Sequence, residues 1–145
     1  MSEYSRWVHS VNFDSINTWD DWHLVPMSRP VINPPTKKTV FVDIPGADGR
    51  LDLSEVVSGG PVYNNRTGSI EFMVQNGFKP WSEMFSTVMN ALHGKYMNVS
   101  LDDDPEWHYR GLISVTKWTT GDHYSTITID YDLEPYKYSG KDKSL

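Results

Sequence analysis

The stretch TITIDYDLE, residues 126–134, alternates apolar and polar side chains with a period of two. Its apolar members are Ile127, Ile129, Tyr131 and Leu133. Because successive side chains of a β-strand point to opposite faces of the sheet, this order predicts a strand with one buried face and one solvent-facing face. The stretch therefore favours an antiparallel sheet as the main element of the fold.

The segments on either side of this stretch carry weaker forms of the same pattern. Residues 110–118 predict a second strand, which a hairpin turn at residues 119–122 joins to the first. Further strands are expected in chain order at residues 10–14, 23–25, 40–44, 69–75 and 97–101.

One segment has the period of a helix instead. Apolar residues recur three and four positions apart from Trp81 to Leu92, which predicts one helix over about residues 81–93. Gly94 follows at the position where a left-handed C-cap is common. Because one crossover helix cannot build a doubly wound α/β sheet, the sequence predicts a mainly β fold. We expect a β-sandwich or barrel with the helix packed against it, in a single domain over residues 1–145.

Two segments fit neither period. Residues 25–36 hold four of the nine prolines. Proline fixes φ and cannot donate a hydrogen bond to a neighbouring strand, so this segment is expected to be extended, either as a sheet edge or as an arm lying on a neighbour. Residues 138–145 have few groups to bury and predict a flexible C-terminal tail.

Composition and charge exclude several classes of protein. The chain has no cysteine, so it contains neither a disulfide nor a thiolate metal site. Its formal net charge of −6 argues against a general nucleic-acid binder and against docking on an anionic membrane surface. No stretch approaches the roughly 20 apolar residues that cross a bilayer.

Catalytic and metal-binding patterns are weak. The five histidines are scattered, with no i, i+4 pair of the kind that binds zinc on a helix, and no G-x-S-x-G motif marks a nucleophilic serine. The acidic cluster at residues 102–104 precedes Pro105 and is interpreted as a solvated turn. We therefore predict no enzyme activity, no metal site and no cofactor.

The aromatic residues leave two possibilities open. Trp and Tyr side chains could form a sugar-stacking platform, which would make the chain a carbohydrate-binding β-sandwich for host recognition. They could also serve the core and subunit interfaces, where Trp and Arg are common anchors. The residues chosen as interface candidates lie in loops or irregular segments: Trp19, Trp22, Arg29, Arg50 and Arg66.

Several short motifs together carry a more specific signal. They lie at residues 17–26, 28–35, 42–55, 62–66 and 92–95, followed by the strand at 97–101 and the acidic turn. In this order and spacing, the chain resembles the N-terminal domain of the distal tail (Dit) proteins of long-tailed bacteriophages and related prophages. The resemblance covers about residues 11–136.

The resemblance implies a tail-tube-like β-sandwich or barrel with one helix and an extended belt hairpin. It also implies a structural role in the virion, as a hexameric ring at the distal end of the tail, assembled in the host bacterial cytoplasm. The implied partners are other copies of the chain, the tail tube protein, the tail-tip or baseplate hub and receptor-binding proteins. DNA is expected to pass through the lumen without specific binding. The family has no catalytic residues to carry over.

Many relatives continue into a second β domain, whereas this sequence ends about ten residues after its last predicted strand. We therefore expect ring and connector duties rather than direct receptor or sugar binding.

Overall fold

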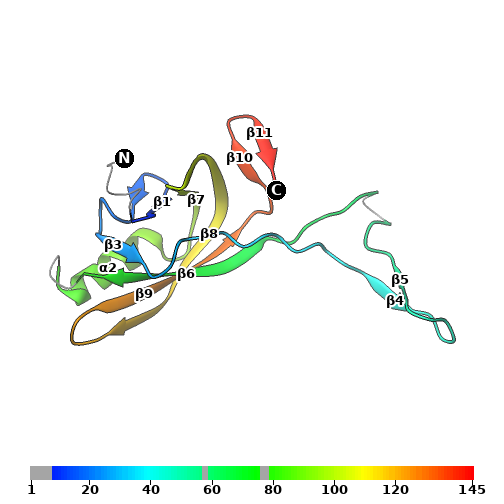
Figure 1. The fold of residues 1–145 in the computed structure, drawn as a ribbon, viewed down its shortest axis with the longest axis horizontal. Coiled ribbons are helices and arrows are strands. Elements are labelled where there is room, and N and C mark those ends of the chain that lie inside the picture. The colour runs from blue at the N-terminus through cyan, green and yellow to red at the C-terminus, as the bar shows by residue number, and fades with distance from the viewer. Residues whose placement is uncertain (1–7, 57–58, 76–78) are drawn as a thin grey trace.

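The structure is a computed structural model and describes residues 8–56, 59–75 and 79–145. Within these residues, nine strands form one antiparallel sheet whose main path is β2-β1-β7-β8-β9-β6-β3 (Figure 1). The strands of this path are β1 (Val11–Phe13), β2 (Ile16–Asn17), β3 (Leu24–Pro26), β6 (Arg66–Val74), β7 (Lys95–Leu101), β8 (Asp104–Thr120) and β9 (Ser125–Leu133). The sheet curls into a half-barrel, which confirms the predicted β-rich fold with one helix.

Strand β9 forms the centre of the sheet and pairs along its whole length with β6 and β8. Its four apolar residues from Ile127 to Leu133 are at most 5% exposed, so the predicted buried face is confirmed. The other predicted strands are present as well, with shifted ends.

The predicted turn between β8 and β9 was placed two residues too early. Thr119 and Thr120 continue the pairing with β9, and the turn lies at residues 121–124, where the Gly121 N–H donates to the Tyr124 carbonyl at 3.0 Å. A bulge in β8 between Val115 and Lys117 shifts the register and prolongs the strand.

The helix α2 (Trp81–Leu92) confirms the predicted helix. It buries Met84, Val88 and Leu92 against the inner face of the sheet, and these residues join the strands in one hydrophobic core. Gly94 takes a φ of +77°, as expected for the residue that ends a helix. The opposite face of the sheet is not covered by any described element (Figure 1).

The proline-rich segment has two parts. Pro26 ends β3 at the edge of the sheet, which agrees with the expected edge position. Residues 27–33 then run beside β6 and bury Pro30 and Ile32 in their own domain.

The described residues between positions 34 and 65 extend away from the domain, and we call this segment the arm (Figure 1). Its base closes at a bridge between Lys37 and Tyr63, and farther out β4 (Phe41–Asp43) pairs with β5 (Arg50–Asp52) as a separate two-stranded sheet. This is the extended hairpin that the resemblance implied.

The last residues form a second hairpin where the sequence predicted a flexible tail. Strands β10 (Lys137–Ser139) and β11 (Asp142–Ser144) pair with each other, and β10 joins β8 through Tyr138 and His108. Lys137 Nζ lies 3.8 Å from a carboxylate oxygen of Asp104 and 5.2 Å from the centre of the Trp107 ring. The flexibility of this hairpin stays a prediction.

Candidate functional site

One face of the hairpin formed by β4 and β5 carries exposed aliphatic side chains. Val42 lies opposite Leu51 in the hairpin register, and Val40 and Ile44 share the parity of Val42 along the strand. We call these four residues the aliphatic face. They are between 42% and 55% exposed, so the described residues of this chain leave about half of their surface uncovered.

The other face of the hairpin is charged. The Arg50 guanidinium lies 3.8 Å from the centre of the Phe41 ring, a cation–π contact on the protein surface. Hydrogen bonds from Ser54 hold the pKa of the Asp52 carboxyl below its usual range. These contacts shape the hairpin but bury little of it.

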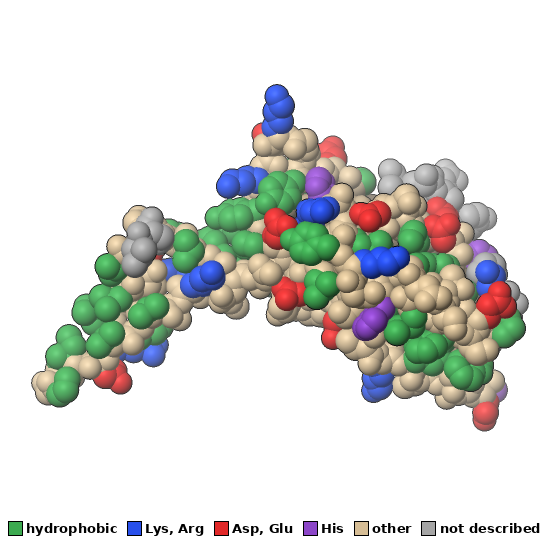
Figure 2. Space-filling model, turned by 180° about the vertical axis from the view of Figure 1, so that it is seen from behind, with side chains coloured by type: hydrophobic (Ala, Val, Ile, Leu, Met, Phe, Trp, Pro, Cys, Tyr) green, Lys and Arg blue, Asp and Glu red, His purple; other side chains and the backbone are tan. Residues whose placement is uncertain are grey.

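An isolated two-stranded hairpin is at best marginally stable in water, because it has no second layer to bury its apolar side chains. Figure 2 shows hydrophobic side chains along the arm, which extends away from the body of the protein. Exposed aliphatic surface of this kind marks an interaction site. The arm is therefore the strongest candidate for a contact with another molecule.

The point where the arm leaves the domain is firmly held. The Asn33 N–H donates to the Tyr131 hydroxyl at 2.9 Å, and the Asn33 side-chain amide donates to the Thr67 carbonyl at 2.9 Å. Gly68 makes this possible, because a Cβ there would lie 2.4 Å from the Tyr131 hydroxyl oxygen and 2.5 Å from Asn33 Nδ2. The arm thus has a fixed origin and an unsupported hairpin.

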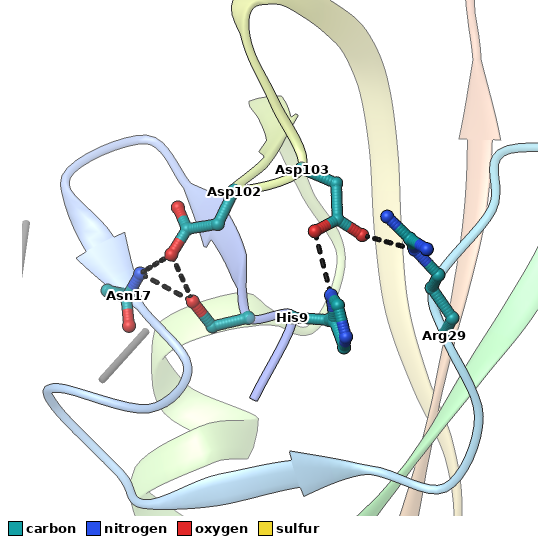
Figure 3. Close-up of polar contacts among 6 residues, drawn as sticks. His9, Asn17, Arg29, Asp102 and Asp103 are labelled. Carbon is teal, nitrogen blue, oxygen red and sulfur yellow. Dashed lines mark hydrogen bonds and ion pairs between the residues drawn. The ribbon is translucent and has the colours of Figure 1, made fainter. Parts of the chain in front are cut away.

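A second polar cluster ties the N-terminal strands to the turn between β7 and β8 (Figure 3). Asp102 is only 3% exposed, and its carboxylate accepts hydrogen bonds from the Ser10 hydroxyl and from the side-chain amides of Asn12 and Asn17. A buried carboxylate requires such donors. The interpretation of residues 102–104 as a solvated turn is therefore wrong for Asp102, which has a structural role.

The neighbouring Asp103 joins two segments that are far apart in the sequence (Figure 3). One carboxylate oxygen lies 2.7 Å from His9 Nδ1, and the other accepts a hydrogen bond from Arg29 Nε at 3.0 Å. Partial burial raises the pKa of Asp103, but the hydrogen bonds and charges of His9 and Arg29 outweigh it and hold this pKa below its usual range.

We expect Asp103→Asn to lower the free energy of unfolding by about 1 kcal/mol at pH 6, the usual scale of a partly exposed charged hydrogen bond. The folded-state pKa of Asp103 is lowered, so its contribution is present above the unfolded-state pKa of about 3.9 and is lost as the pH falls through the folded-state value. Urea unfolding at a series of pH values should show the two proteins converging in acid. Asp122→Asn, which alters an exposed turn, is the control; a pH-independent difference for Asp103→Asn would contradict the assignment.

The five interface candidates from the sequence do not come together. Arg29 and Arg50 are exposed, and Trp19 is half-buried with its ring stacked on His23 at 4.9 Å. Trp22 is 6% exposed and belongs to the core. Arg66 is 5% exposed and donates to the carbonyls of Pro135 and Asn33.

Sequence reasoning missed the aliphatic face as a site. The sequence predicts a strand at residues 40–44. A strand pattern does not show whether another layer of the protein packs against its apolar side chains. The sequence does contain a signal for the hairpin, namely Gly46 and Gly49 between two short apolar segments. In the structure both glycines have positive φ and lie between the paired residues 41–43 and 50–52.

Within the described residues, no group of three His, Asp or Glu side chains is arranged to hold a metal ion. The depressions on the surface are open, and the one over β6, β8 and β9 is lined by residues such as Ser69, Ser114 and Asp130. None of the described helices is long and apolar enough to cross a membrane.

The curled antiparallel sheet with one helix has the same fold as a solved bacteriophage protein. That protein is SPP1 Dit (gp 19.1), one of the solved structures similar to this chain, described as a paradigm of the hub adsorption apparatus in phages that infect Gram-positive bacteria. The likeness has a TM-score of 0.67 and covers 90% of this chain at 16% sequence identity. This chain matches 51% of the length of SPP1 Dit.

At that identity the likeness establishes the fold. No protein-family model matches the chain, and no curated protein matches it.

Proposed function

We propose that this chain is a structural subunit of a bacteriophage tail, which forms a hexameric ring at the distal end of the tail. The ring connects the tail tube to the tail-tip or baseplate hub and to receptor-binding proteins, and it belongs to the virion after assembly in the host cytoplasm. The observation that carries this proposal is the fold shared with SPP1 Dit over nine-tenths of the chain. No catalytic function is part of the proposal.

The arm supports assembly from identical copies. A closed ring uses one patch of each subunit against a different patch of the next. The aliphatic face is a surface that one subunit leaves exposed and a neighbour could bury. Burial of such side chains yields roughly 25 cal/mol per Å² of apolar surface, which would stabilise both the contact and the hairpin.

The uncovered face of the sheet supports a lumen through which DNA passes without being held. Its side chains are mostly Ser, Thr, Asp and Glu, and its carboxylates outnumber its cations. The carboxylates in question are Glu71, Asp130, Asp132 and Glu134, against Arg110 and Lys117. Such a face repels phosphate groups.

Of the interface candidates chosen from the sequence, we retain Trp19, Arg29 and Arg50. Each has surface that a partner could contact. Trp22 and Arg66 are almost fully buried, and contacts within the domain account for their positions.

No observation favours the carbohydrate-binding alternative. Among the described aromatic residues, Trp22 lies in the core and Trp118 packs edge-on against Phe85. The more exposed rings of Trp81, Tyr96 and Tyr124 lie on α2, on β7 and in the turn between β8 and β9.

Mass photometry and negative-stain imaging of the purified chain test the proposed function. We expect particles with six times the mass of the 16.7 kDa chain and a central opening. A species that stays monomeric at high micromolar concentration would contradict self-assembly into a ring.

A further inference from the structure

The hairpin of β10 and β11, which we call the C-terminal hairpin, lies beside the point where the arm leaves the domain (Figure 1). The Tyr136 ring, just before β10, meets the Tyr63 ring at the base of the arm edge to face, with 6.3 Å between the ring centres and 90° between the planes. Lys143 Nζ of β11 lies 4.8 Å from the centre of the same Tyr136 ring. The arm and the C-terminal hairpin are therefore in direct contact, although they lie far apart in the sequence.

Arg66 joins the origins of the arm and of the C-terminal hairpin a second time. Its side chain is 5% exposed. Its Nε donates to the Pro135 carbonyl at 2.9 Å, and Nη1 donates to the Asn33 carbonyl at 3.3 Å. Asn33 precedes the arm, and Pro135 precedes the C-terminal hairpin. Because hydrogen bonds from a charged group are strong and a buried charge cannot be left without partners, Arg66 holds the two origins together.

A single contact would leave the arm free to swing about it. Arg66 holds the arm at its origin, and Tyr63 lies farther along, at the bridge that pairs it with Lys37. The Lys38 N–H donates to the Val62 carbonyl at 2.8 Å, so both chains of the arm base are tied to the position of Tyr63. Two contacts at different distances along the arm fix its direction as well as its origin.

The C-terminal hairpin is attached to the body independently of the arm. Strand β10 pairs with β8 through Tyr138 and His108, and Lys137 Nζ lies 3.8 Å from a carboxylate oxygen of Asp104. The Tyr138 hydroxyl also donates to the Glu134 carboxylate at 3.3 Å. These contacts tie the hairpin to the long strand of the main sheet, so it can support the arm from a fixed position.

The other polar contacts of the arm base are weaker supports. The Asn64 side-chain amide donates to the Thr36 hydroxyl at 3.0 Å, a contact within the arm itself. The Asn65 side-chain amide donates to the Asp132 carboxylate at 3.0 Å and does reach β9. Both hydrogen bonds are exposed, so water competes for the same groups. The aromatic contact between Tyr63 and Tyr136 does not have this competition.

We propose that the C-terminal hairpin is a brace that sets the direction of the arm, with the contact between Tyr63 and Tyr136 as its point of support. Lys143 stabilises the Tyr136 ring through a cation–π contact. The brace acts within one copy of the chain and does not depend on the proposed assembly. It requires residues 138–145 to be ordered, in contrast to the flexible tail that the sequence predicted. A molecule that displaced the C-terminal hairpin would release the arm.

Because the chain has no cysteine, two introduced cysteines can carry spin labels at chosen positions. Thr39→Cys lies on the arm just beyond its base, and Leu112→Cys lies on β8; both positions are exposed. The full chain also carries Val42→Asp/Leu51→Asp, so that contacts between copies do not hold the arm. Pulsed electron paramagnetic resonance then gives the distribution of distances between the arm and the body.

Tyr136→Ala should broaden this distribution of distances. It should also raise the hydrogen-exchange rate of the Asn64 amide, at the arm base, by about fivefold, the scale of one aromatic edge contact. Tyr136→Phe keeps the ring and should leave both measurements unchanged. The matched control is Tyr124→Ala, which removes an exposed ring from the turn between β8 and β9, at the end of the molecule opposite the arm (Figure 1).

Tyr63→Ala removes the arm's half of the same contact, and it replaces Tyr136→Ala if circular dichroism shows that the latter does not fold. An unchanged distribution and exchange rate in the folded variant would overturn the brace, and so would equal changes in Tyr124→Ala. Fast exchange of the amides of residues 137–144 in the unsubstituted chain would overturn it as well, because a mobile hairpin cannot hold the arm.

Discussion

We expect the double variant Val42→Asp/Leu51→Asp to fold normally and to remain monomeric. Both side chains are more than 40% exposed in the single chain, so the substitutions should change the free energy of unfolding by less than about 0.5 kcal/mol each. At a buried subunit contact, an unpaired carboxylate must instead lose its water. A loss of about 2 kcal/mol per anchor corresponds to a dissociation constant weakened roughly 30-fold, and two anchors act together.

The control for this variant adds two carboxylates elsewhere. Ser86→Asp/Asn90→Asp places them on the exposed side of α2, at a cost of a few tenths of a kcal/mol in the helix. Mass photometry should show rings for the control and monomers for the arm variant. Rings from both proteins would show that the aliphatic face is not buried in the assembly.

The largest loss of stability is expected for Gly111→Ala. Gly111 lies in β8 between Met97 of β7 and Leu133 of β9. A Cβ at this position would lie 2.2 Å from the Asp132 carbonyl oxygen and 2.6 Å from the Leu133 Cα. Both atoms belong to the backbone of the central strand, so the sheet must deform, and we expect a loss of about 3 kcal/mol.

Circular dichroism during urea and thermal unfolding measures this loss. For a chain of this length, about 3 kcal/mol should lower the midpoint of thermal unfolding by roughly 10 °C. Gly60→Ala is the matched control, because a Cβ there would meet no atom within 4 Å. Each glycine substitution is made separately in the arm variant Val42→Asp/Leu51→Asp, so that unfolding is measured without dissociation of an assembly. Equal stability of the Gly111→Ala and Gly60→Ala proteins would contradict the close packing at Gly111.

Much of the domain could be predicted from the sequence because its local patterns agree with its tertiary contacts. Strand β9 and helix α2 each have one apolar face, and each buries it. The turn after β8 was misplaced because a bulge changes the register by one residue, and alternation alone does not reveal a bulge. The C-terminal hairpin was missed because it joins the body through β8, which lies far away in sequence.

The interface residues were harder to predict, because their residue types did not show whether each side chain would end inside or outside the domain. Trp22 enters the core, and Arg66 is held by carbonyl groups from two distant segments, Asn33 and Pro135. The exposed apolar residues of the arm form an ordinary strand pattern. Only the three-dimensional arrangement shows that no layer formed by the described part of the chain covers them.

The bridge between Lys37 and Tyr63 has a consequence for how such proteins can diversify. The Asn64 N–H donates to the Thr36 carbonyl at 2.7 Å, so the two places where the chain enters and leaves the arm are immediate neighbours. An insertion whose ends meet in this way can be shortened, lengthened or exchanged for another without moving the strands that flank it. Recombination at this one junction could therefore give the same body a new attachment, with a different partner, in a single genetic step.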